Sequence, residues 1–191
     1  MEHILFDFLS KYIPLDEEEK NALIALDIFH SVNKGTVLLN EGQTTNENYF
    51  VLKGCIRTYY VVDGEEKTTA FYTEMEGLTP ACVISKTPSE YYVSCLEDSI
   101  LIISNTEMAE ETNHKFPKFD TLCRMLSEEL LAKHQIDFDK FKTSSPEQRY
   151  LNLLQERPDL IQRVPQHQLA SYLGIKPQSL SRLRARISER K

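Results

Sequence analysis

The chain has few cysteines, and the four that it has lie far apart. Cys55, Cys82, Cys95 and Cys123 form no C-x-x-C pair, and no cysteines cluster near the N-terminus. These absences argue against a zinc knuckle, a thiol-redox motif and an iron–sulfur centre, and we expect the cysteines to be small core residues. The five histidines show neither H-x-H nor H-E-x-x-H spacing, so we expect no metal, no cofactor and no metal-dependent enzyme.

Long apolar runs are also missing. No stretch approaches the roughly 20 apolar residues that a membrane-spanning helix needs. The first seven residues, MEHILFD, have no basic region and no cleavage site, so no secretory signal is apparent. We therefore expect a cytoplasmic protein with no membrane partner.

Positive charge is scarce except at the C-terminal end. The net charge of the chain is −7, but residues 142–191 contain ten Lys and Arg against four acidic residues, a local charge of +6. The remaining residues therefore carry −13. A basic end on an acidic protein is typical of a segment that meets nucleic-acid phosphates.

The pattern of residues 166–191 predicts two helices around a tight turn at Gly174. Leu169, Ala170 and Leu173 give the first helix an apolar face, and glycine adopts positive φ at low cost. Pro177 suits the first turn of a second helix, whose stripe of Leu180, Leu183 and Ile187 follows helical spacing. The other face carries short polar groups and arginines, as in a helix-turn-helix that reads the major groove. A solvated arginine-rich face is the alternative.

The middle of the chain predicts a small β-barrel. From about residue 31 to 104 the apolar stretches are short and rich in β-branched and aromatic residues, with Gly turns between them. Asp63-Gly64, between 59–62 and 67–71, is a strong hairpin signal. Six strands are expected, at 37–40, 49–52, 55–62, 67–72, 91–95 and 99–103. Many short strands at regular spacing favour a sandwich or jelly roll.

Helical segments flank this barrel. Asp16 and Glu19 form a capping-box pair that begins a helix with Leu23, Ile24, Leu26 and Ile28 inward. A long helical stretch is expected from about 107 to 141, with Phe119, Leu122, Leu126 and Leu130 on one stripe that continues through His134, Asp137/Phe138 and Phe141. This stripe packs on its own barrel or forms a dimer seam, and we favour the seam. Ser145, Pro146 and Gln148 predict a capped helix after a short linker, with Leu151 and Leu154 packed inward.

This order of elements resembles the Crp/Fnr family of bacterial transcription regulators. The resemblance rests on KGTVLLNEG at 34–42, YFVLKG at 49–54 and LASYLGI at 169–175. The segments PEQRY at 146–150 and SLSR at 179–182 are similar to the short members typical of Bacteroidetes-like genomes.

The resemblance implies an α+β fold in three parts. It implies a cyclic-nucleotide-binding-type sensor barrel at 1–106, a dimerisation helix at 107–142 and a helix-turn-helix domain at 143–191. The sequence ends soon after the second helix, so no full wing is expected. The implied partners are double-stranded DNA, a second copy of the chain, a small-molecule effector and RNA polymerase.

The resemblance also implies roles for residues of the second helix. The family's base-reading positions fall on Pro177, Gln178, Ser179 and Arg182. Proline replaces a common arginine reader, Gln178 suits adenine or a cytosine amine, and Arg182 suits guanine. Ser179 is expected at a phosphate. The further DNA-binding candidates are Lys176, Ser181, Arg184 and Arg186, mainly as backbone contacts.

The expected ligand pocket departs from the family pattern. An ungapped placement puts Gly77, Leu78 and Thr79 where cyclic-AMP-binding members have Gly-Glu-Leu, and Pro88-Ser89 where they have Arg-Ser. Proline cannot pair a phosphate, and Glu90 adds a repulsive charge. We expect no binding of cyclic AMP or GMP in the family manner. The pocket then holds another ligand or is filled by Leu78, Val83, Ile84 and Tyr91.

Taken together, the sequence predicts a dimeric, sequence-specific DNA-binding regulator that responds to an effector other than cyclic AMP. The alternative is a ligand-sensing or protein-interaction module with a vestigial DNA-binding end. A cupin-like enzyme is disfavoured because clustered His and Glu ligands are missing.

Overall fold

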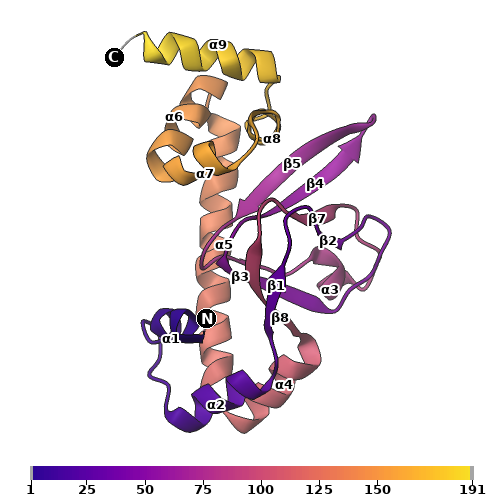
Figure 1. Ribbon diagram of the computed structural model, residues 1–191, viewed down its shortest axis with the longest axis vertical. Coiled ribbons are helices and arrows are strands. Elements are labelled where there is room, and N and C mark those ends of the chain that lie inside the picture. The colour runs from indigo at the N-terminus through magenta and orange to yellow at the C-terminus, as the bar shows by residue number, and fades with distance from the viewer. Residues whose placement is uncertain (1, 190–191) are drawn as a thin grey trace. The chain divides into compact units, whose positions relative to one another are not determined.

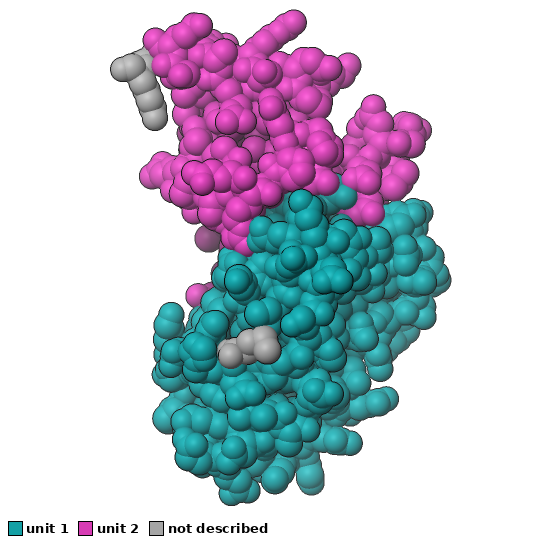
Figure 2. Space-filling view, viewed as in Figure 1, with its two compact units in different colours: residues 1–58, 71–128 teal, residues 59–70, 129–191 magenta. Residues whose placement is uncertain are grey.

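The computed structural model describes residues 2–189, so Met1, Arg190 and Lys191 lie outside the description. Arg190 and Lys191 are two of the basic residues counted above. The chain divides into two units, residues 1–58 with 71–128 and residues 59–70 with 129–191 (Figure 2). This division differs from the three predicted segments, because it joins a hairpin tip of the β-region to the C-terminal helices. The three-part domain division therefore stays a prediction.

Two short helices open the first unit. They are α1 (Glu2–Leu9) and α2 (Glu17–Ala25). Asp16 and Glu19 form the predicted capping box, in which each side chain accepts from the other residue's backbone N–H. The prediction that Ile28 lies within this helix is wrong. Asp27 has a φ of 50°, which turns the chain out of the helix, and Ile28 is buried just before the first strand.

The β-region consists of two four-stranded sheets, shown in Figure 1. One has the order β1-β8-β3-β6 and the other β2-β7-β4-β5. The strands are β1 (Phe29–Val32), β2 (Val37–Leu39), β3 (Glu47–Lys53), β4 (Ile56–Val62), β5 (Glu65–Tyr72), β6 (Gly77–Leu78), β7 (Tyr92–Cys95) and β8 (Ser99–Asn105), with the short helix α3 (Ala81–Ser85) before β7. The sequence missed β1, an edge strand whose middle residues are exposed, and β6, which is only two residues long.

The β4–β5 hairpin has the predicted turn. Asp63 and Gly64 have φ values of 53° and 76°, and two successive positive φ angles make the primed turn that suits the twist of paired strands. The sequence signal and the backbone agree here because the turn chemistry is local.

The predicted long helix is two helices, α4 (Thr106–Lys115) and α5 (Lys118–Thr143). Pro117 separates them, because proline disfavours helical backbone in Phe116 before it and lacks an N–H. Asn105 caps α4 by accepting from the N–H of Met108 at 2.8 Å.

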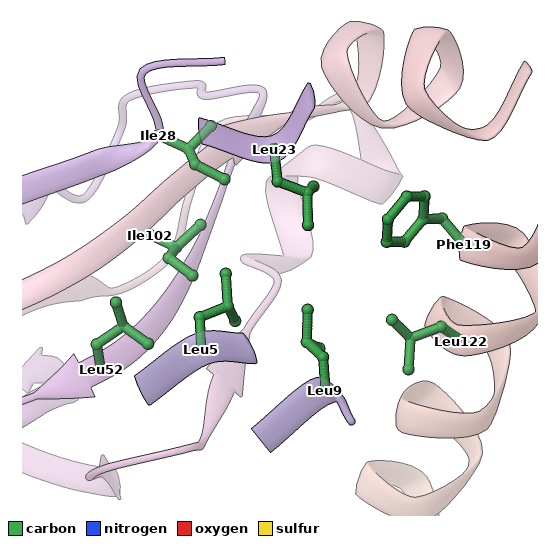
Figure 3. Close-up of a cluster of buried hydrophobic side chains, with 8 residues drawn as sticks. All are labelled: Leu5, Leu9, Leu23, Ile28, Leu52, Ile102, Phe119 and Leu122. Carbon is green, nitrogen blue, oxygen red and sulfur yellow. The ribbon is translucent and has the colours of Figure 1, made fainter. Parts of the chain in front are cut away.

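A hydrophobic core lies beneath these helices in the first unit (Figure 3). Leu5, Leu9 and Leu23 come from α1 and α2, and they face Phe119 and Leu122 of α5. Phe119 and Leu122 are only 4% and 3% exposed. These two members of the predicted dimer stripe therefore pack inside their own chain.

The C-terminal part of the second unit contains four helices: α6 (Pro146–Glu156), α7 (Pro158–Arg163), α8 (Gln166–Tyr172) and α9 (Pro177–Ser188). Ser145 caps α6 as predicted, but the Gln148 side chain donates to Asn152 instead of closing a capping box. The inward face of α6 carries Tyr150 and Leu153, one residue out of phase with the predicted Leu151 and Leu154.

The cysteines are mostly core residues. Cys55, Cys82 and Cys95 are buried, whereas Cys123 is exposed on α5, so the prediction is wrong for Cys123. No helix within residues 2–189 is both long and apolar enough to cross a membrane.

Candidate nucleic-acid interface and sensor pocket

Helices α8 and α9 are the two helices predicted around Gly174. Leu169 and Ala170 of α8 are buried, as are Leu173 at its C-cap and Leu180 and Leu183 of α9. These side chains form a shared apolar seam between the helices, and α9 is thereby held with its opposite face outward.

The turn between these helices has a defined hydrogen-bond pattern. Gly174 has a φ of 70°, its N–H donates to the Ser171 carbonyl at 2.9 Å, and the Ile175 N–H donates to the Ala170 carbonyl at 3.0 Å. This is a Schellman motif, which satisfies the last carbonyls of α8. A left-handed residue is needed at this position, and glycine supplies it without strain.

Two further side chains pack against this turn. The Arg149 guanidinium of α6 lies over the Phe141 ring, 4.2 Å from its centroid. A Cβ at Gly174 would lie 3.1 Å from an Arg149 terminal nitrogen and 3.3 Å from the Phe141 ring. The turn is therefore closely packed as well as left-handed.

The outward face of α9 carries all of the predicted DNA contacts. The predicted residues are exposed without exception: Lys176, Gln178, Ser179, Ser181, Arg182, Arg184 and Arg186. Pro177 is the first residue of the helix and has no N–H, and the N–H groups of Ser179 and Leu180 donate to the Lys176 carbonyl. The surface is suited to an anionic ligand through its polar side chains, its cations and the positive end of the helix dipole.

Two of these cations have acidic neighbours within the same unit. Arg186 forms an ion pair with Glu147 of α6. Lys176 is close enough to Glu65 of the β4–β5 hairpin to help lower the pKa of that carboxyl, although the main cause is a hydrogen bond from Lys67. Arg186 is thus engaged by an acidic side chain of its own chain.

The β4–β5 hairpin is joined to α8 through Ser171. The Thr68 N–H donates to Ser171 Oγ at 2.9 Å, and that hydroxyl donates to the Glu66 carbonyl at 3.1 Å. Sequence reasoning missed this contact. The partners are 103 and 105 residues apart, and no local pattern pairs residues at such separation.

The predicted ligand-pocket residues lie around β6 and the segment before β7. Leu78 and Ser89 are buried, Gly77 is half-buried and Thr79 is exposed. Ser89 is fully engaged within the chain: its hydroxyl donates to the Tyr91 carbonyl at 2.8 Å, and its backbone bonds to Gly42 and Gln43. Ser89 therefore has a structural role, because its hydroxyl and its backbone are hydrogen-bonded within the chain.

Other side chains fill part of this region. Val83 is buried, and the Tyr91 hydroxyl accepts from the Ala81 N–H at 3.0 Å. Ile84, which was expected to fill the pocket, is instead 76% exposed. It lies near the end of α3, a helix of only five residues.

The exposed apolar groups of α5 agree with the predicted stripe only in part. Leu126 and Leu130 are half-buried, while Phe138, a later member of that stripe, is 57% exposed. Leu131, which was not predicted, is 71% exposed. It lies seven residues before Phe138 and so on the same side of the helix. The dimer seam stays a prediction.

No cluster of three or more His, Cys, Asp or Glu side chains able to hold a metal occurs among residues 2–189. The expectation that the protein uses no metal remains a prediction.

The β-region is similar to a known domain family. Residues 29–111 match the family model of the cyclic nucleotide-binding domain, a segment that runs from β1 into α4. No curated protein sequence matches the chain.

Solved structures resemble the chain over most of its length. The c-di-GMP-responsive regulator CLP of Xanthomonas campestris has 15% identity and a TM-score of 0.69, with 91% of this chain and 92% of CLP covered. FixK2 of Bradyrhizobium japonicum has 14% identity and a TM-score of 0.68 over 85% and 84% of the two chains. A protein of Eubacterium rectale, described as a regulator of the Crp/Fnr family, has 19% identity and a TM-score of 0.66 over 88% and 82%.

These matches confirm the predicted fold class. The chain combines a jelly-roll β-region of the cyclic nucleotide-binding type with a long helix and C-terminal helices, which is the fold of the Crp/Fnr regulators.

Proposed function

We propose that this chain is a sequence-specific DNA-binding transcription regulator of the Crp/Fnr type. The observation that carries the proposal is the outward face of α9, where three arginines and short polar groups lie opposite a buried leucine seam. A helix held in this way can enter the major groove while its apolar side stays packed. We expect such a protein to act in the cytoplasm, together with DNA and RNA polymerase, and not as an enzyme.

Base reading falls to two exposed side chains. Arg182 has the fork geometry for guanine O6 and N7, and Gln178 can pair with adenine. Ser179 and Lys176 lie at the start of α9, where the helix end favours a phosphate. Arg184 and Arg186 extend the basic surface. For Arg186 to contact a phosphate, its ion pair with Glu147 must open.

We further propose a homodimer through α5. Leu131 and Phe138 are large, apolar and exposed on one side of a helix of 26 residues. A second copy would remove this surface from water, and a two-fold dimer would present two copies of α9 to two half-sites.

The effector is proposed to be something other than cyclic AMP. The segment between β6 and β7 contains no arginine, Pro88 stands where a phosphate partner is needed, and Ser89 is bonded within the chain. Without a charge-assisted partner a cyclic phosphate loses its main attraction. Calorimetry should therefore detect no micromolar binding of cyclic AMP.

The β4–β5 hairpin supplies a route by which the β-region acts on the DNA-binding helices. Its tip bonds to α8 through Ser171, and its strands continue into the sheet that contains β7. A change that shifts the hairpin would also bias the placement of α8 and α9.

A second candidate is a ligand-sensing or protein-interaction module whose DNA-binding end is vestigial. The ion pair of Arg186 with Glu147 favours it, because a basic residue held by an acid contributes less to a phosphate surface.

Selection from a random duplex library at about 0.15 M salt separates the two candidates. The wild type should enrich a palindrome with half-sites about one helical turn apart. Arg182→Ala should lose the enrichment, while Lys34→Ala, which removes the same charge from an exposed position of the first unit, should retain it. Failure of the folded wild type to enrich any sequence, with every effector tested, would favour the second candidate.

A further inference from the structure

An apolar cavity of about 200 Å³ lies in the first unit, among its helices and one face of the β1-β8-β3-β6 sheet. Leu9, Leu23, Met108, Phe119 and Leu122 contribute to its wall. Figure 3 shows five of the lining residues, with Leu5, Leu9 and Leu23 of α1 and α2 facing Phe119 and Leu122 of α5. The cavity is separate from the predicted ligand pocket, since none of Gly77, Leu78, Thr79 or Ser89 lines it.

The cavity is open to solvent over part of its surface, so it is an apolar pocket that water can reach and not an enclosed void. Its volume of about 200 Å³ is enough for a small molecule. An open apolar wall is costly to leave in water, so a matching ligand gains free energy by covering it.

The residues that line the cavity indicate which class of ligand it can bind. Among the lining residues within 2–189 there is no Asp, Glu, Lys or Arg, and the polar ones are Ser104, Thr112, Asn113 and Cys123. The Thr112 hydroxyl already donates to the Met108 carbonyl at 2.7 Å. A charged ligand would lose its hydration without meeting an opposite charge among these lining residues.

We propose that this cavity binds a small, uncharged, hydrocarbon-like molecule, with the bulk of a single aromatic ring or a short alkyl chain. Cyclic nucleotides and other phosphates are disfavoured, because none of the described lining residues is a Lys or Arg that could pair with a phosphate.

Helix α5 connects this cavity to the second unit of the chain. The first turns of α5 line the cavity, and the same helix runs on without interruption to Thr143 in the second unit. A ligand that alters the packing of Phe119 and Leu122 therefore acts on the helix that carries the exposed Leu131 and Phe138. The ligand site itself requires neither DNA nor dimerisation.

Toluene is a suitable probe, and the full-length chain with labelled leucine methyl groups is the protein to use. Toluene should shift the methyl resonances of Leu9, Leu23 and Leu122 in the cavity wall and leave those of Leu169 and Leu180 unchanged. It should also raise the thermal midpoint of the first unit by about 6 °C at roughly ten times its Kd. Benzoate, the same ring with a carboxylate, should do neither.

Two variants give a matched comparison. Ala109→Phe places a ring in the wall of the cavity and should abolish both effects of toluene. Ala25→Phe makes the same change at an exposed position of α2 that does not line the cavity, and it should retain both effects.

The proposal is overturned if the wild-type methyl groups of the wall do not respond to toluene, if the Leu169 and Leu180 groups respond instead, or if benzoate binds as well as toluene. The methyl measurement on wild-type protein decides the question even if Ala109→Phe does not fold. A negative result leaves the DNA-binding proposal untouched, because no step of the test involves DNA.

Discussion

Ser171 of α8 and Thr68 of β5 are joined by a hydrogen bond of 2.9 Å from the Thr68 N–H to the Ser171 hydroxyl. The same hydroxyl donates to the carbonyl of Glu66. One short side chain thus satisfies a donor and an acceptor on the hairpin tip and ties that tip to the helix before the recognition turn.

Removing this link should loosen the hairpin without unfolding the chain. Ser171→Ala deletes both hydrogen bonds, and a bond of this kind contributes about 1 kcal/mol. The Thr68 amide should therefore exchange its hydrogen several-fold faster. Ser188→Ala, at the exposed end of α9, is the control, and equal exchange of Thr68 in wild type and Ser171→Ala would show that the link is not maintained in solution.

Gly174 should tolerate alanine less well than Gly35, although both have positive φ. Gly35→Ala meets no atom within 4 Å and pays only the backbone cost of roughly 1–2 kcal/mol. Gly174→Ala adds the approach to Arg149 and Phe141, which we expect to cost about 1 kcal/mol more. Hydrogen exchange of buried amides measures each unit separately, and equal losses at the two positions would contradict the close packing.

Lys176 should contribute to DNA affinity without contributing to sequence preference. Lys176→Ala should weaken binding to all duplexes alike and reduce the salt dependence of log K by about one ion. Fluorescence anisotropy over a salt series measures the slope. Lys34→Ala, which removes the same charge from an exposed position in the first unit, should leave it unchanged, and a base-specific loss at Lys176 would argue against a phosphate contact.

The exposed side of α5 should control self-association. Leu131→Asp places a charge where an apolar side chain would be covered by a second copy, so the dimer Kd should rise at least about tenfold, or 1.4 kcal/mol. Sedimentation equilibrium measures the dimer Kd. Gln155→Asp, at an exposed position of α6, is the control. A wild type that stays monomeric at all concentrations would refute the dimer.

Stability should fall at alkaline pH because of Cys95. Burial raises the pKa of its thiol from 9.0 to about 11, so the unfolded chain releases this proton at a lower pH than the folded chain. The favourable contribution is complete below pH 9.0 and is lost as the pH rises toward about 11. Denaturation at pH 8, 9 and 10 should show a shallower decline in Cys95→Ala than in wild type, and parallel curves would contradict the assignment.

Local patterns were enough to predict much of this molecule. The Asp16 capping box, the Asp63-Gly64 turn and the Gly174 turn each depend on a few adjacent residues, and the structure has all three. The alternation and spacing of apolar residues predicted the two apolar faces of α8 and α9 for the same reason. The exposed polar face of α9 follows from that spacing, because the residues between buried positions must face outward.

Tertiary structure decided what periodicity alone leaves open. An apolar stripe indicates that one face of a helix is buried, but it does not identify the element that buries it. Phe119 and Leu122 were therefore expected at a dimer seam, whereas they pack with α1 and α2. Edge strand β1 has little apolar pattern of its own and is defined by its pairing with β8. The Ser171 link and the apolar cavity bring together residues far apart in the chain. Such relationships arise only when the whole chain packs, because they depend on side-chain shape and position in three dimensions rather than on neighbours in sequence.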